Sequence, residues 1–209
     1  MDRGETLFAK YDIGSTLRNG PARLVQSIDA LSDAEILDGG QEKLVQRLVV
    51  DHLIAIPELH LDAVEPSQCE VDIDVSGDQT RMIYDRSRPS YIKGTEISFR
   101  VPFTGDPDVF RCQPSSYSLN PPHADIERDA IIVRVVRQDQ NPQEFRKVFD
   151  YAINQINSAL AQLRLDCAGL EKALQNAASA RLIQRREKRQ KDRELIDQLG
   201  FSQRKPSSK

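Results

Sequence analysis

Residues 149–177 read FDYAINQINSALAQLRLDCAGLEKALQNA, and apolar side chains return there at every third or fourth position. From residue 153 to residue 177 the steps alternate between three and four, which is the heptad spacing of a coiled coil. One isolated helix cannot bury so narrow a stripe, so we expect a partner surface to cover it. We call this stripe the seam and predict that it mediates self-association. The seam consists of Ile153, Ile156, Leu160, Leu163, Cys167, Leu170 and Leu174.

The seam belongs to a long predicted helix over residues 142–199. Asn141 can cap its first turn, and the fixed backbone angle of Pro142 suits the first helical position. No further proline interrupts the sequence over that range. In the alternative architecture the helix breaks near Gly169 or Ala177 and forms a hairpin, whose halves bury the seam against each other without a second chain.

Before this helix the apolar period changes from about 3.6 to two along the chain. Helical spacing over residues 21–54 predicts short N-terminal helices, and a capping-box pattern from Ser32 to Glu35 begins one of them. Apolar and polar residues alternate in short runs over residues 58–136, which is typical of strands. We therefore predict an α+β fold: short N-terminal helices, an antiparallel β-sheet of short strands and a long C-terminal helix, either coiled-coil-like or a helical hairpin.

These patterns divide the chain into four predicted segments. Residues 1–20 are polar and contain three glycines, so we expect a flexible N-terminal arm. Residues 21–140 form the α+β body, and residues 141–200 form the long helical segment. Residues 201–209 are expected to be a disordered tail.

Composition narrows the class of protein. The 209 residues are 39% hydrophobic and 29% charged, with a net charge of −3. The N-terminus lacks the order of a signal peptide, and no apolar run approaches the length of a membrane helix. The three cysteines have no short spacing that would indicate a disulfide framework or a metal knuckle. We expect a cytoplasmic protein that does not associate with membranes and has no cofactor.

Charge is distributed unevenly along the chain. Residues 141–209 hold 14 Lys and Arg against 8 Asp and Glu, whereas the preceding residues are acidic. A basic helix end could neutralise several phosphates of a nucleic acid. It lacks interleaved aromatic residues for base stacking, and a solvated helix end with intrahelical pairs is the alternative. The candidate contacts are Arg181, Arg185, Arg186, Lys188, Arg189, Lys191 and Arg193.

No catalytic constellation is evident from the residues. There is no nucleophile elbow and no glycine-rich phosphate loop. Asp72, Asp74 and His60 would be the centre of any unrecognised enzyme site, but the two aspartates are typical of the solvated face of a strand. We expect no catalytic residue, no metal site and no small-molecule substrate, and therefore no enzyme.

The segment from residue 85 to residue 122 is dense in Arg, Asp, Pro and Gly. We expect Arg–Asp pairs to make its loops rigid, and rigid loops on a sheet often carry binding sites. The candidate recognition residues are Asp85, Arg86, Arg88, Asp106 and Asn120.

Several motifs in this segment and beyond it resemble an uncharacterised bacterial family. They are DRSRP at 85–89, GTE at 94–96, VPFTGDP at 101–107, PSSYSLNPP at 114–122, RREK at 185–188 and LGF at 199–201. The resemblance covers essentially the whole chain.

In longer relatives this region looks like the N-terminal module of proteins that end in a restriction-endonuclease-like domain and are associated with phage defence. The nuclease motif is missing from the 209 residues. The resemblance therefore implies a non-catalytic sensor, adaptor or oligomerisation part of a defence system, which binds a partner protein or itself. The alternative function is nucleic-acid binding by the basic helix end at residues 181–193.

Overall fold

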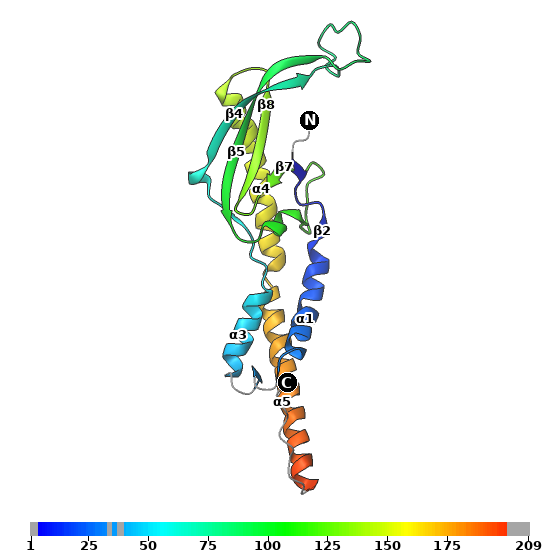
Figure 1. Ribbon diagram of the computed structural model, residues 1–209, viewed down its shortest axis with the longest axis vertical. Helices are drawn as coiled ribbons and strands as arrows, with labels where there is room; N and C mark the ends of the chain where they lie inside the picture. Colours follow the sequence, from blue (N-terminus) through cyan, green and yellow to red (C-terminus); the bar gives the residue numbers. More distant parts are fainter. Residues whose placement is uncertain (1–3, 33–34, 37–39, 200–209) are drawn as a thin grey trace, which may run out of the picture. The chain divides into compact units, whose positions relative to one another are not determined.

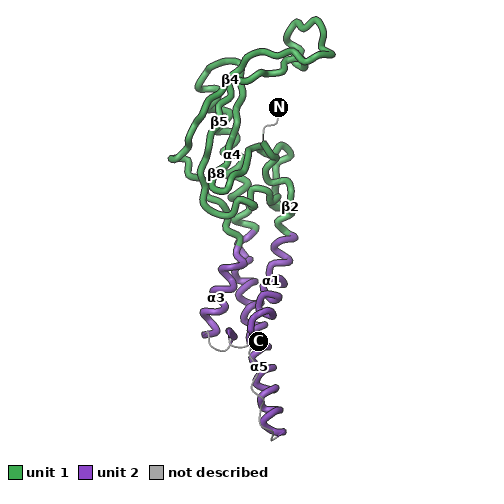
Figure 2. The backbone as a smooth tube through the Cα atoms, viewed as in Figure 1, with its two compact units in different colours: residues 1–14, 54–166 green, residues 15–53, 167–209 purple. Residues whose placement is uncertain are grey.

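The computed structural model describes residues 4–32, 35–36 and 40–199. Half of the chain is helical and 23% is strand, arranged as a curled antiparallel sheet and a long C-terminal helical segment (Figure 1). The chain forms two compact units (Figure 2). Unit 1 comprises residues 1–14 and 54–166, and unit 2 comprises residues 15–53 and 167–209. These boundaries differ from the predicted segments, because the N-terminal helices cluster with the C-terminal helix and not with the sheet.

Unit 1 is built around β5 (Tyr91–Thr104), a strand of 14 residues. β8 (Ala130–Arg137) pairs with it on one side, and β4 (Glu65–Asp74) and β3 (Glu58–Leu59) pair with it on the other. β7 (His123–Ile126) and β1 (Glu5–Thr6) continue the sheet beyond β8, and all of these pairings are antiparallel. The predicted antiparallel sheet is confirmed.

The helix α4 (Pro142–Cys167) lies against this sheet (Figure 1). Apolar residues recur at every second position of β5, and their register partners on β8 are the buried residues Ile131, Val133 and Val135, so the two sets share one face of the sheet. The Phe99 ring of β5 meets the Phe149 ring of α4 with centroids 4.4 Å apart. Four of the five seam residues of α4 are buried, at 4% relative exposure or less: Ile153, Ile156, Leu160 and Leu163.

The N-terminal residues are part of the core of unit 1. Leu7 and Phe8 are buried, and the Phe8 ring lies 6.1 Å from the Phe110 ring. The Arg111 guanidinium donates two hydrogen bonds to the Glu5 carboxylate, at 3.1 and 2.6 Å. β2 (Tyr11–Asp12) pairs in parallel with β6 (Cys112–Gln113). The predicted flexible arm over residues 1–20 is therefore wrong for residues 4–20, while residues 1–3 lie outside the described part.

Unit 2 contains α1 (Ile13–Asp29), α3 (Gln41–His52) and α5 (Leu170–Leu199). α1 begins eight residues before Pro21, the residue expected to start it, because the Asp12 carboxylate accepts a hydrogen bond from the Gly14 amide and caps the first turn. With 17 residues, α1 is longer than the short helix predicted.

The capping box over residues 32–35 forms as expected at its described ends. The Ser32 amide and hydroxyl both donate to the Glu35 carboxylate, at 2.8 and 2.7 Å.

Helix α5 packs against both other helices of unit 2. Leu170 and Leu174 lie over Gly20 of α1, where an added Cβ would come within 3.3 Å of the Leu170 side chain. The buried stripe then continues through Ala178 and Leu182, and Ala177 is only half-buried. The stripe thus changes from heptad steps to steps of four where α5 packs against α1 and α3.

The long helix is interrupted at Ala168 and Gly169, between α4 and α5. The break falls where the alternative architecture placed it. The two helices nevertheless lie against different elements: α4 lies against the sheet of unit 1, where Phe149 packs on Phe99 (Figure 1), and α5 packs against α1 and α3. These leucines and isoleucines are buried within one chain, so the seam does not require a second chain to cover it. Self-association stays a prediction. Cys167, at the break, is half-buried.

The alternating runs over residues 58–136 include predicted strands at 59–63, 109–113 and 116–119, and each differs in part from the structure. Residues 61–63 form the short 3-10 helix η1 (Leu61–Ala63), and residues 109–111 belong to the 3-10 helix η2 (Pro107–Arg111), whereas residues 112–113 form β6. η2 begins after Asp106, whose side chain accepts the Asp108 amide hydrogen bond at 2.9 Å. Residues 116–119, expected to be a strand, form a loop. The predicted tail over residues 201–209 lies outside the described residues.

The burial of the seam predicts the effect of truncating one leucine. Leu163 is fully buried on α4, whereas Leu165, two positions on, is 70% exposed. Leu163→Ala should lower the free energy of unfolding by about 2–5 kcal/mol, since it leaves a cavity in the buried core beside α4. The matched variant Leu165→Ala should change it by less than about 0.5 kcal/mol. Urea denaturation followed by circular dichroism measures both, and equal effects would contradict the packing of α4.

Candidate binding cleft on unit 1

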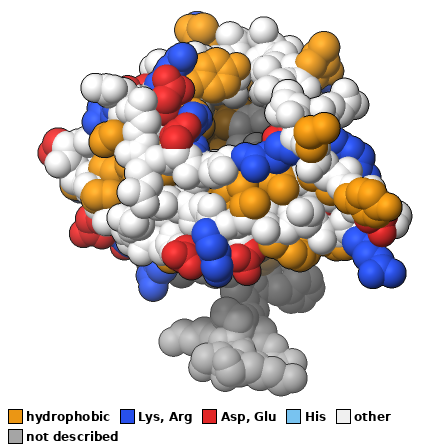
Figure 3. Space-filling model, turned by 90° about the horizontal axis from the view of Figure 1, so that it is seen from above, with side chains coloured by type: hydrophobic (Ala, Val, Ile, Leu, Met, Phe, Trp, Pro, Cys, Tyr) orange, Lys and Arg blue, Asp and Glu red, His pale blue; other side chains and the backbone are white. Residues whose placement is uncertain are grey.

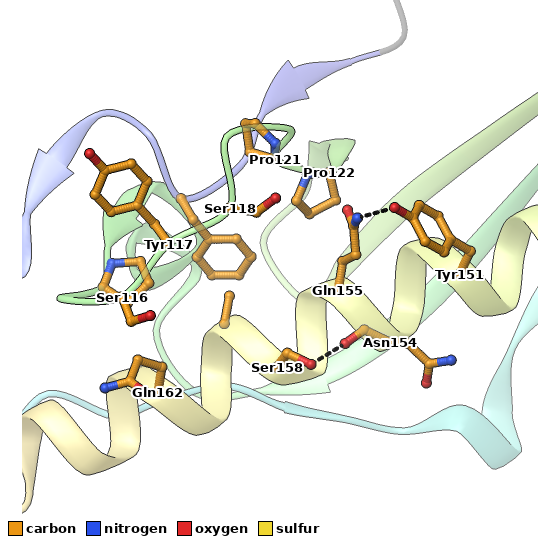
Figure 4. A pocket seen from close by; sticks show the side chains of 13 residues that line it. Ser116, Tyr117, Ser118, Pro121, Pro122, Tyr151, Asn154, Gln155, Ser158 and Gln162 are labelled. Atoms are coloured by element: carbon orange, nitrogen blue, oxygen red, sulfur yellow. Dashed lines mark hydrogen bonds between the residues drawn. The ribbon is translucent and has the colours of Figure 1, made fainter.

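A cleft lies between α4 and the loop at residues 114–122 (Figure 4). Its volume is about 480 Å³. Phe8 lies at the cleft from the N-terminal segment, and the other residues come from the loop and from α4. The lining residues are Phe8, Pro114, Ser116, Tyr117, Ser118, Pro121, Pro122, Tyr151, Asn154, Gln155, Ser158, Ala159 and Gln162.

A second cavity of about 490 Å³ adjoins the first. The two share Pro121, Pro122, Tyr151 and Gln155, so they form two lobes of one groove along α4, which we call the α4 groove. Residues added by the second lobe are Gly4, Thr6, Asn120, His123, Val148 and Ala152. Although 29% of the chain is charged, the described residues that line the two lobes include no Asp, Glu, Lys or Arg.

The groove uses a second face of α4, adjacent to the seam. Groove residues recur along the helix at residues 148, 151, 155, 158 and 162, with the steps of three and four that align side chains on one helical face. The face carries a valine, a tyrosine and uncharged polar residues. Its side chains lack the apolar periodicity that marks the seam, so the groove was not predicted from the sequence.

An aspartate near the end of α4 attaches the loop to the helix. The Ser115 amide and hydroxyl donate to the Asp166 carboxylate at 2.8 and 2.6 Å. The Gln162 amide donates to the same carboxylate at 3.0 Å and to the Ser115 hydroxyl at 3.2 Å. Burial on its own would raise the pKa of Asp166, but the hydrogen bonds from Ser115 and Gln162 outweigh it and lower the pKa below the ordinary 3.8. The carboxylate is therefore the form that holds this wall of the groove.

Hydrogen bonds within the groove orient several of its polar groups. The Gln155 amide donates to the Tyr151 hydroxyl oxygen at 2.7 Å, and the Ser158 hydroxyl donates to the Asn154 carbonyl at 2.8 Å (Figure 4). In the loop, the Ser118 hydroxyl accepts the Asn120 amide at 3.1 Å. Because Tyr151 accepts from Gln155, its own hydroxyl hydrogen remains available to a ligand.

The predicted recognition residues are not gathered at one site. Asp85, Arg86 and Arg88 lie in the loop between β4 and β5, whereas Asn120 lines the second lobe of the groove. The Arg86 guanidinium donates to the backbone carbonyls of Ser76, Asp78 and Arg81, at 2.8–3.0 Å. Asp85 accepts from its neighbour Ser87, and Asp106 caps η2. Arg86 therefore orders its loop through backbone carbonyls, and Asp85 through its neighbour Ser87. Among the five predicted recognition residues, the only Arg–Asp ion pair joins Arg88 to Asp85, and both side chains of this pair are exposed.

The same β4–β5 loop displays apolar side chains. Met82 and Tyr84 are fully exposed. Seen from the end of unit 1 that carries this loop, the surface shows hydrophobic patches among Lys, Arg, Asp and Glu side chains, and it is hollowed near its centre (Figure 3).

Three arginines of the predicted nucleic-acid contact bind other residues of unit 2, the unit to which they belong. Arg181 pairs with Asp29 at 2.7 Å, and Arg185 donates to the carbonyls of Ile28 and Leu31 at the end of α1. Arg186 donates to the Ile36 carbonyl and to Gln41.

The rest of α5, residues 187–199, is exposed and carries four Lys and Arg, namely Lys188, Arg189, Lys191 and Arg193, against four Asp and Glu. The net charge of residues 187–199 is therefore zero, while Arg185 and Arg186 keep their charges because carbonyl groups do not neutralise them. Nucleic-acid binding by residues 181–193 stays a prediction.

The weak metal and enzyme candidates do not come together. Asp72 pairs with Lys93 at 3.0 Å on the exposed face of the β4–β5 hairpin, while Asp74 accepts the Ser76 and Ser90 amides. The bonds from Ser76 are the main reason that the pKa of Asp74 is lowered. The described part of the chain contains no group of three or more His, Cys, Asp or Glu with the geometry of a metal site. Among the described helices, none is long and apolar enough to cross a bilayer.

Comparison of the chain with protein-family models, with curated proteins and with solved structures finds no match.

The Asp166 anchor predicts how the groove wall responds to mutation and to acid. Asp166→Asn should increase hydrogen exchange over residues 114–120, because the carboxylate that accepts three of the loop and helix donors is lost. Asp150→Asn, which removes an exposed pair with Arg146 on the same helix, should leave that exchange unchanged.

The lowered pKa of Asp166 also predicts how the fold responds to acid. A folded-state pKa below the ordinary value stabilises the fold above pH 4, and this contribution is lost as the pH falls through the folded-state pKa. The chemical shift of the Ser115 amide, which follows the titration of the Asp166 carboxylate, should therefore change with a midpoint below pH 3.8. A midpoint above that value would contradict the anchor.

A second prediction separates structural from nucleic-acid roles of the basic helix. Arg185→Ala should destabilise unit 2 by about 2 kcal/mol, since the terminal carbonyls of α1 lose a charged donor. Lys188→Ala, three residues on and exposed, should leave the stability unchanged. Thermal unfolding of both variants is the measurement. If Arg185→Ala leaves the melting temperature unchanged and abolishes retention on DNA, then the residue is a nucleic-acid contact and not a cap.

Proposed function

We propose that the protein is a non-catalytic binding module and that the α4 groove is its recognition site. The observation that carries this proposal is the uncharged lining of a groove on a highly charged protein. Surface residues of a solvated helix are normally charged, so a neutral face that is open to solvent favours a ligand that lacks charge.

The size and composition of the groove support the proposal. Each lobe lies within the range of about 300–1,000 Å³ that is typical of ligand sites. Aromatic and proline side chains provide apolar contact, and a few amides and hydroxyls provide direction. The exposed aromatic side chains Tyr117 and Tyr151, at 57% and 60%, are of the kind that dominates recognition surfaces.

The anchoring of the groove also supports a binding role. The walls come from two segments that are tied together by Asp166, and Phe8 is held by the aromatic cluster with Phe110. A site whose walls are ordered before binding loses less entropy when a ligand enters.

The biological setting of the module rests on the sequence motifs. We propose that it serves as a sensor or adaptor in a nuclease-associated defence system, with a protein partner; the support is the resemblance of residues 85–122 and 185–201 alone. Loss of protection against phage in cells that carry a groove variant, with protein levels unchanged, would be the expected result. Unaltered protection would remove this setting and leave the binding site in place.

Ligand titration tests whether the groove binds. With phenol and N-acetylproline methylamide as uncharged probes, amide chemical shifts should change saturably at residues 114–122 and on α4. Tyr151→Ala should weaken this binding by about tenfold, the contribution of one aromatic contact. Tyr91→Ala, a tyrosine of similar exposure on β5 at 62%, is the matched control and should not alter it. Small shifts scattered over the whole surface, the same in both variants, would contradict the proposal.

A further inference from the structure

We propose that the ligand of the α4 groove is an extended, uncharged peptide segment that contains proline in the polyproline II conformation. This inference rests on the proposed function and names the class of ligand for the same site. It follows from the shape of the groove, from the side chains that line it, and from the hydrogen-bond donors that it offers.

The groove is long enough for a peptide. Its lining runs along α4 from Val148 to Gln162, a distance of about 21 Å at 1.5 Å per residue. A polyproline II chain advances about 3.1 Å per residue, so about seven residues would lie along it. Two lobes of nearly equal volume, separated by the shared residues Tyr151 and Gln155, suit a repeating ligand better than one compact molecule.

The apolar side chains of the groove match the surface of a proline-rich segment. Tyr117 and Tyr151 present aromatic groups from the loop and from α4, and Phe8 adds a third ring to the first lobe. Such aromatic-lined grooves accept the preformed ridges of a polyproline II helix, which loses little conformational entropy on binding. The groove's own prolines, Pro121 and Pro122, stiffen the wall between the two lobes.

The polar groups of the groove match the backbone of such a segment. A polyproline II chain has no internal hydrogen bonds, so its carbonyl oxygens need donors from outside. The Tyr151 hydroxyl accepts from Gln155 and is thereby left as a donor beside the wall that joins the lobes. The Tyr117 hydroxyl makes no hydrogen bond to any other described residue, and it is a second donor at the first lobe.

The uncharged lining of the two lobes disfavours charged peptide classes within them. Charged side chains line a neighbouring cavity on α4, which shares Tyr151 and Asn154 with the first lobe and contains Arg146, Lys147 and Asp150. A phosphorylated or acidic segment would need Arg or Lys in the lining, and a basic segment would need Asp or Glu. The lining of both lobes provides neither, and the nearby Asp166 carboxylate is already occupied by Ser115 and Gln162.

Isothermal titration calorimetry with the full chain tests the inference, using a capped peptide of about seven residues with the repeat Ala-Pro-Pro. A second peptide replaces each proline by alanine. The proline peptide should bind at least about tenfold more tightly than the alanine peptide. Tyr151→Ala should reduce its affinity by about tenfold, while Tyr91→Ala should not. Circular dichroism confirms that both variants fold.

The outcomes separate this inference from the proposed function. Equal binding of both peptides, or binding of the alanine peptide alone, would overturn the polyproline II inference and leave the groove as a binding site. The inference also fails if neither peptide binds while phenol still shifts the groove residues. Absence of binding by both peptides and by both small probes would overturn the inference and the proposed function together.

Discussion

Burial of the apolar seam within the chain's own units is the interaction on which the rest of the structure depends. A continuous apolar stripe on α4 and α5 must be shielded from water, and the chain supplies a different cover for each half. The α4 half is buried within unit 1, where the helix lies against the sheet, and the α5 half packs against α1 and α3 in unit 2. The division into two units follows from this arrangement, with the break at residues 168–169 close to their boundary.

The same arrangement places the groove. Once the seam face of α4 lies on the sheet, its neighbouring face with Tyr151, Gln155 and Gln162 is open to the loop at residues 114–122. Asp166 then holds the loop in position, across 51 residues of sequence. Some charged residues elsewhere have a structural role: Arg86 orders the β4–β5 loop, and Arg185 donates hydrogen bonds to carbonyls at the end of α1. The uncharged groove stands out against them, and for this reason it is the surface to which we assign recognition.

The sequence allowed the period-two strands to be predicted, because the alternation of Ile97, Phe99, Val101 and Phe103 survives in β5. The predicted unbroken helix over residues 142–199 was wrong, and the interruption at Ala168 and Gly169 matches only the alternative, which placed a break near Gly169 or Ala177. The start of α1 was missed because Gly14 and Gly20 suggest a loop, while the capping by Asp12 depends on local geometry. The groove was missed because its walls meet only after folding: no spacing in the sequence shows that Ser115 will meet Asp166. The seam was found, but its cover was not, since periodicity shows which face is buried and not what buries it.

The mass of the protein in solution is the most direct measurement of the central claim, that the seam is buried by the chain itself. Sedimentation equilibrium from low to high micromolar concentration should give the mass of one chain, and the unfolding midpoint should not depend on concentration. A stable dimer at the lowest concentration, with an unfolding midpoint that rises with concentration, would contradict it.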